Sequence, residues 1–337
     1  MRPRVGDLPD NIATDLLEHL NGQLPQFQAM PGLVGITLNG GLSRGYADSL
    51  SEVDVTLYLD DAGQNAVESG QCPVPLGIAV MTGQLYDIKT VSYQEELERQ
   101  FGQVDLWDMS YARILFDPED KIGELFAAKL STRPKGADAA DHLWDAYWHY
   151  KLAGDIWIAR GDVEQGHLVL NRSVEGLLKA VFVTNEEYVP HEKWLVHMSR
   201  TLSWLPGDYD GRLSAAMVPA TSDLLGLRQR QQVISLLGED LDQHIRRQHL
   251  GGFPLASHQK YFYDLLKWLA ERGSVPLAEW RERARMSFLC MDPFRLVASI
   301  DGDRIVLDTR RLRALTPGDM YAWHYEIAAA VSAESLS

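Results

Sequence analysis

Two patterns of apolar residues divide the chain. In roughly the first 130 residues, short apolar runs of strand length alternate with stretches whose apolar positions repeat every three to four residues. The expected strands are 33–38, 53–59, 76–81, 84–91 and 110–116, and the expected helices are 10–24, 93–101 and 121–130. The segment 60–75 is polar and predicts a loop, with room for one helical turn. Strands and helices interleaved in this way indicate an α/β domain with a small mixed sheet.

Helical periodicity dominates the rest of the chain. The clearest linker, Thr132-Arg133-Pro134-Lys135-Gly136, separates two predicted domains, 1–132 and 137–337. The second is predicted to be an all-helical bundle that ends in a short hairpin, 295–309, around an Asp-Gly turn. Its expected helices are 138–159, 163–183, 191–205, 213–227, 231–249, 257–271 and 317–331.

A glycine-rich turn follows the first predicted strand. Asn39-Gly40-Gly41 ends that strand, and glycine allows the positive φ angles and the close backbone approach that a sharp turn beside a ligand needs. A short helix is expected from Leu42, and the amide groups and dipole at its start favour an anion. The turn therefore predicts a phosphate cradle.

Two carboxylates stand where the second predicted strand begins. Glu52 and Asp54 are two residues apart, so their side chains leave the same face of the sheet. Carboxylates placed so close raise each other's pKa unless a cation lies between them, and Mg²⁺ suits such a set of oxygen donors. Asp87, on the strand 84–91, is a candidate third acid; the alternative is a solvent-facing aspartate on an edge strand.

The turn and the acid pair together resemble the polymerase-β-like nucleotidyltransferases. The shared pattern is an apolar residue, two glycines, about ten further residues, and then acid-apolar-acid-apolar, which is Glu52-Val53-Asp54-Val55 here. The longer form Gly-Gly-Leu-Ser-Arg-Gly-Tyr at 40–46, with Lys-Trp-Leu at 193–195, is most similar to stand-alone bacterial nucleotidyltransferases of the DUF4037 type. Relatives of that group include aminoglycoside and lincosamide nucleotidyltransferases. One position departs from the family, because Glu52 stands where the first acid is usually aspartate.

The resemblance implies a role for each candidate residue. Glu52, Asp54 and Asp87 would be catalytic and would hold metal, in two Mg²⁺ ions, with Asp87 completing the metal site or accepting the proton of the attacking hydroxyl. The residues that would contact the triphosphate of the NTP co-substrate are Gly40, Gly41, Ser43, Arg44 and Lys193. For Arg44 a surface position on a short helix is equally compatible with the sequence.

Composition narrows the choice of partner. The net charge is −15 at pH 7, which argues against a protein that follows nucleic-acid phosphates and favours a small acceptor. No run of about 18 apolar residues is present, so a membrane span is not expected. The two cysteines are too few for a disulfide framework and fit a reducing cytoplasm.

The sequence thus predicts a metal-dependent enzyme that moves a nucleoside monophosphate, AMP for preference, from an NTP to a hydroxyl of a small molecule, releasing pyrophosphate. Three alternatives stay open: a toxin-type enzyme that modifies protein or RNA, a non-catalytic nucleotide-binding protein, and a structural partner in a complex that binds no nucleotide. The acceptor and the oligomeric state have no signal in the sequence.

Overall fold

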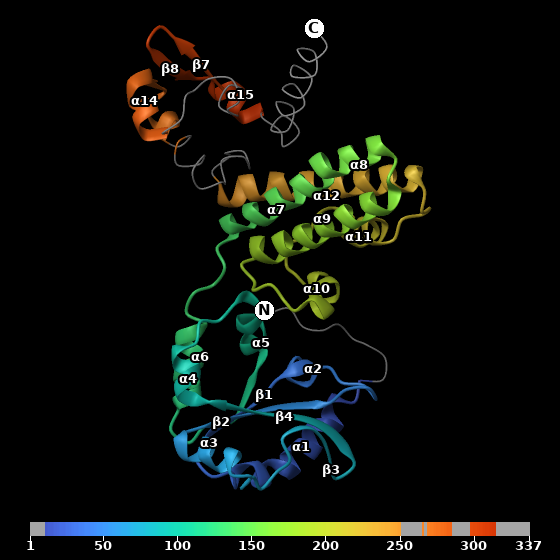
Figure 1. The fold of residues 1–337 in the computed structure, drawn as a ribbon, viewed down its shortest axis with the longest axis vertical. Coiled ribbons are helices and arrows are strands. Elements are labelled where there is room, and N and C mark those ends of the chain that lie inside the picture. Colours follow the sequence, from blue (N-terminus) through green and yellow to red (C-terminus); the bar gives the residue numbers. More distant parts are fainter. Residues whose placement is uncertain (1–10, 251–264, 266–267, 285–296, 315–337) are drawn as a thin grey trace. The chain divides into compact units, whose positions relative to one another are not determined.

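A computed structural model describes residues 11–250, 265, 268–284 and 297–314 (Figure 1). The chain forms two compact units. The first combines Met1–Pro134 with Glu187–Ser203, and the second combines Lys135–Glu186 with Trp204–Ser337. The segment that carries Lys193 therefore belongs to the first unit. None of the helices in the described ranges is long and apolar enough to cross a membrane.

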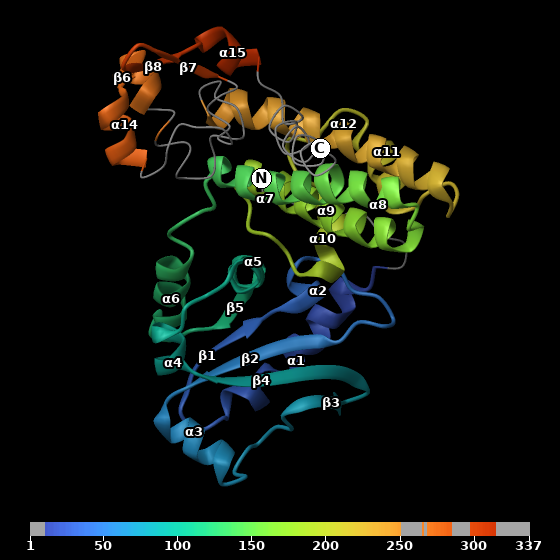
Figure 2. The same ribbon diagram turned by 45° about the horizontal axis from the view of Figure 1, so that its top comes forward.

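The first unit contains a five-stranded sheet with the order β3-β4-β2-β1-β5 (Figure 2). Neighbouring strands run antiparallel except β2 and β4, which are parallel. The strands are β1 (Leu33–Leu38), β2 (Val53–Leu59), β3 (Gly77–Met81), β4 (Gln84–Ser92) and β5 (Arg113–Phe116). The predicted α/β domain with a small mixed sheet is confirmed.

Helices cover both faces of this sheet (Figure 1). They are α1 (Ala13–Gln28), α2 (Gly40–Ser43), α3 (Asp61–Glu68), α4 (Tyr93–Glu98), α5 (Gln103–Tyr111), α6 (Lys121–Lys129) and α10 (Glu192–Ser199). On one face, Val53, Val55 and Leu57 of β2 pack with Leu20 and Phe27 of α1 in a continuous apolar core. On the other face, residues of α5 and α6 pack around Tyr58. The alternation along β2 thus leaves Asp54 and Thr56 for the second face.

Two predictions in this unit were wrong in detail. The apolar run 110–116 is a strand only from Arg113, and the residues before it end α5, a helix that was not expected. The buried positions of α5, Trp107 and Met109, are two residues apart, so they form no helical stripe in the sequence. The expected loop at 60–75 contains the eight-residue helix α3, whose start is capped by the Asp60 side chain accepting from the Gly63 N–H at 2.9 Å.

The second unit is mainly helical. Its helices are α7 (Ala139–Tyr147), a π-helical turn (Trp148–Ala153), α8 (Gly154–Arg160), α9 (Val163–Thr184), α11 (Tyr209–Met217), α12 (Leu224–His249), α14 (Leu277–Ala284) and α15 (Thr309–Ala314). The predicted hairpin is present as β7 (Ala298–Asp301) and β8 (Arg304–Leu307), but a third strand, β6 (Ser274–Pro276), also pairs with β8. The expected helix 317–331 and most of 257–271 lie outside the described residues.

Candidate active site

The turn after β1 is built against the second strand. The Asn39 N–H donates to the carbonyl of Asp54 at 2.9 Å, which holds the turn beside the start of β2. Gly40 has φ +66°, and a side chain at this position would collide with the Asp54 carboxylate. The Ser43 hydroxyl donates to the Gly40 carbonyl at 2.9 Å, so it stabilises the turn. The glycine at position 40 is therefore required by both backbone conformation and space.

The structure brings together the three acids that the sequence singled out. Asp54 and Asp87 are direct partners across the parallel pair β2–β4, and Glu52 lies just before β2. One carboxylate oxygen from each residue lies within 4.8 Å of the other two. All three side chains are half-buried.

The charge state of Asp54 reflects this crowding. The pKa of Asp54 is raised to about 6, chiefly by burial and also by the negative charges of Glu52 and Asp87, while Lys89 and Lys193 oppose the rise. The ionised form is thus destabilised by the protein alone. A divalent cation would relieve both the desolvation and the repulsion, so the donor set fits a hard ion such as Mg²⁺.

Lys89 is a member of the site that sequence reasoning did not select. Its Nζ lies 2.7 Å from the Asp87 carboxylate, and this hydrogen bond raises the pKa of Lys89. The signal was present, because Asp87 and Lys89 are two residues apart on one strand and share a face. The Lys89 side chain is 63% exposed, which leaves it able to turn toward a bound anion.

Arg44 lies in the interior rather than on the surface of a short helix. Its guanidinium carbon is 4.6 Å from the centre of the Trp107 ring and 4.9 Å from that of Trp194, and Nη1 is 3.1 Å from Asp108. Burial lowers the pKa of Arg44, although the charge of Asp108 opposes that shift. Among the described residues, Nε of Arg44 and Nε1 of Trp194 have no hydrogen-bond partner. Arg44 therefore connects α2, α5 and α10 through stacking.

Lys193 reaches the same site from the first turn of α10. Its N–H donates to Nδ1 of His191, the residue that caps this helix, at 3.3 Å. Trp194, the next residue, packs on Arg44. The side chain of Lys193 contributes to the electrostatic environment of Asp54, although the two residues are 139 positions apart in the chain.

A cavity of about 370 Å³ joins these groups, within the range of small-molecule sites. Its floor is formed by alternate residues of two paired strands, whose side chains leave the same face of the sheet. These are Asp54, Thr56 and Tyr58 of β2, and Asp87, Lys89 and Val91 of β4. Its walls include Asn39, Gly40, Gly41, Arg44, Glu96, Arg99, Phe101, Asp105, Asp108, Met109, Phe126, His191, Lys193 and Trp194. One end is thus acidic and lies beside the glycine turn, and the other end is partly aromatic.

Comparison with known proteins adds little to this geometry. No family model matches the chain, and no curated protein matches it. Among solved structures, the chain is similar to a nucleotidyltransferase-like protein from Exiguobacterium sibiricum 255-15, with 14% identity and a TM-score of 0.37 over 86% of this chain and 98% of that one. Likeness of this degree does not assign a function to the chain.

Proposed function

We propose that the protein is a metal-dependent nucleotidyltransferase that transfers a nucleoside monophosphate, AMP from ATP for preference, to a hydroxyl of a small molecule. The observation that carries the proposal is the meeting of Glu52, Asp54 and Asp87, because Asp54 and Asp87 line one end of a cavity directly beside the Gly40 turn. Acid residues gathered beside a turn that admits a close ligand are what metal-assisted transfer at phosphorus requires.

The three acids would hold Mg²⁺, two ions in the proposed reaction. Bound there, the metal would supply positive charge to the phosphate oxygens and to the attacking oxygen. The raised pKa of Asp54 means that this carboxyl is fully available as a ligand only above pH of about 6. The presence of Glu52 in place of an aspartate lengthens one ligand by a methylene group.

In the reaction, the acceptor oxygen forms a bond to the α-phosphorus, and the bond from that phosphorus to the oxygen that bridges to the β-phosphate breaks. Pyrophosphate leaves with the electron pair. Asp87 either accepts the proton of the acceptor hydroxyl or completes the metal site, in which case that proton passes to solvent water. Lys193 and Lys89 both line the cavity and would neutralise the charge of the departing pyrophosphate. The backbone of Gly40 and Gly41, with Ser43 supporting the turn, would cradle the triphosphate.

The test is pyrophosphate release from each of the four NTPs with Mg²⁺, in the presence of pooled acceptors that begin with aminoglycosides and lincosamides. Asp54→Asn is expected to abolish release, and Asp61→Asn, an acid in the first turn of α3 that does not line the cavity, is expected to leave it unchanged. Undiminished release by Asp54→Asn would refute the assignment.

Metal-dependent ATP binding without pyrophosphate release from any acceptor would instead support the non-catalytic alternative, which the glutamate at position 52 favours. Protein and RNA acceptors are included in the screen, because a toxin-type enzyme would modify one of these. The net charge of −15 makes RNA the weaker of the two.

A further inference from the structure

The end of the cavity away from the acids has a different chemistry. Tyr58 is four positions after Asp54 on β2, which corresponds to about 13 Å along the strand. At this end Phe101, Met109 and Phe126 join Tyr58 in lining the cavity. A ligand that places its phosphates at the glycine turn could extend along the two strands to reach these apolar side chains.

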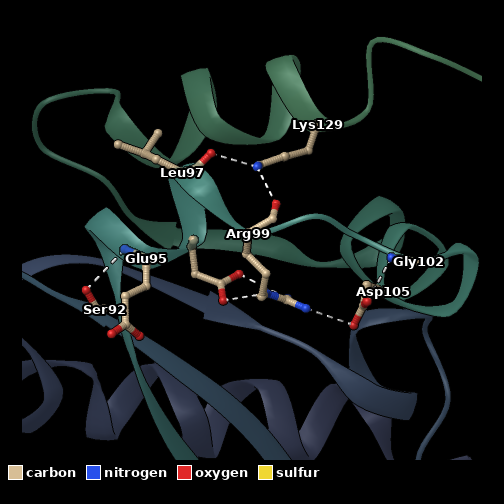
Figure 3. A network of polar contacts seen from close by, with 8 residues as sticks. Ser92, Glu95, Leu97, Arg99, Gly102, Asp105 and Lys129 are labelled. Carbon is tan, nitrogen blue, oxygen red and sulfur yellow. Dashed lines mark hydrogen bonds and ion pairs between the residues drawn. The ribbon is translucent and has the colours of Figure 1, made fainter.

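Arg99 lines this end, and its guanidinium is fixed by two carboxylates (Figure 3). Nε and Nη2 donate to the two oxygens of Glu96 at 2.8 and 3.1 Å, and Nη1 lies 3.3 Å from Asp105. The guanidinium carbon is 3.9 Å from the centre of the Phe101 ring. The side chain is nevertheless 44% exposed, so it keeps a surface that Phe101 does not cover.

The backbone that carries this group is also held in place (Figure 3). Lys129 donates to the carbonyls of Leu97 and Arg99 at 2.8 and 2.7 Å. The Gly102 N–H donates to Asp105 at 3.0 Å, and Lys129 lies 4.9 Å from the centre of the Phe101 ring. These contacts join α4, α5 and α6 around the guanidinium, so its plane is set before any ligand arrives.

We propose that Arg99, backed by Phe101, is the stacking platform for the base of the nucleotide, an inference that rests on the proposed function. A flat guanidinium stacks well on planar π systems. Its charge is already paired with Glu96 and Asp105, and these two carboxylates disfavour a phosphate at the same place. The flat face of the Arg99 guanidinium is therefore the part that remains available to a ligand.

The test compares two probes that differ in the base. ATP and inorganic tripolyphosphate, each with Mg²⁺, are titrated by calorimetry into the wild type, Arg99→Lys and Phe101→Leu. Lysine keeps the positive charge and the aliphatic chain of arginine but lacks its planar guanidinium. Both variants are expected to bind ATP about tenfold more weakly, in keeping with the contribution of one base stack, and to bind tripolyphosphate as the wild type does. Melting curves establish that each variant folds, and Phe101→Leu provides the test if Arg99→Lys does not.

Arg133→Lys is the matched control. Arg133 also lies over an aromatic ring, 5.5 Å from the centre of Tyr188, and also pairs with a carboxylate, Glu187 at 3.1 Å, but it does not line the cavity. Arg133→Lys is expected to change neither the affinity for ATP nor the affinity for tripolyphosphate.

Three results would overturn the platform. Unchanged ATP affinity in folded Arg99→Lys and Phe101→Leu would show that no base stacks there. An equal loss for ATP and tripolyphosphate would show that Arg99 only supports the fold. A raised KM for the acceptor with unchanged ATP affinity would assign this end to the acceptor. In each case ATP binding by the wild type would leave the proposed function standing, whereas a wild type that binds no NTP would end both.

Discussion

Replacing Asp54 with asparagine is expected to stabilise the metal-free protein at pH 8. Burial and the neighbouring acids raise the pKa of Asp54 from 3.8 to about 6 in the folded state, so ionisation of this carboxyl opposes folding. The free-energy cost of this ionisation is absent below the pKa that Asp54 has in the unfolded chain. It grows between pH of about 4 and 6, and it reaches its full value above that range. A shift of this size corresponds to about 3 kcal/mol of unfolding free energy.

Calorimetric melting in the presence of a chelator measures this effect and can separate the transitions of the two units. For a unit of about 150 residues, 3 kcal/mol corresponds to roughly 6–12 °C in Tm. Asp54→Asn is expected to raise the Tm of one transition by this amount at pH 8 and to leave it unchanged at pH 4. Asp61→Asn is the control for loss of a carboxylate that lies outside the cavity.

Mg²⁺ is expected to reverse the order of stability. A ligand present at about 1,000 times its Kd stabilises the folded state by about 4.1 kcal/mol, which exceeds the gain of about 3 kcal/mol from the substitution. Only the wild type keeps the full set of three carboxylates that would bind the ion. Two results would refute this explanation of the Asp54 pKa. One is a lower Tm for Asp54→Asn than for the wild type at pH 8 in the presence of the chelator. The other is a difference in Tm between the two proteins that is the same at pH 4 and pH 8.

Three further outcomes follow from the same geometry. Gly40→Ala is expected to destabilise the first unit by at least about 1–3 kcal/mol and to abolish nucleotide binding, because φ is +66° and the new methyl group meets Asp54; wild-type melting and ATP titration would contradict this. Arg44→Leu is expected to loosen Trp194 and to raise the KM for NTP more than it lowers kcat, a split that steady-state kinetics resolves. The affinity of the wild type for Mg²⁺ is expected to decrease when the pH is lowered below about 6. Lys89→Met should move this decrease to higher pH, since Lys89 lowers the pKa of Asp54. Mg²⁺ titrations from pH 5 to 8 measure the position of the decrease, and an unchanged position in the variant would contradict the prediction.

Much of the fold could be predicted because strands with one buried face carry a period of two. The ranges of β1 and β2 match those expected from the sequence. Glu52 and Asp54 were selected from their places at the start of β2, and Asp87 from its place on β4. The helix α5 was missed because its buried positions, Trp107 and Met109, are not spaced like a helical stripe. Local periodicity predicts an element when its buried residues form one continuous face, and the buried residues of α5 do not form such a face.

The sequence by itself determined the glycine turn, the spacing of the acid pair and the period of the strands, since each depends on residues only a few positions apart. Tertiary structure alone decided that Asp87 lies beside Asp54, through the parallel pairing of β2 and β4. It also placed Arg44 between two tryptophans from α5 and α10. A local pattern can specify which face a side chain leaves, but the partner it meets depends on how distant segments pack.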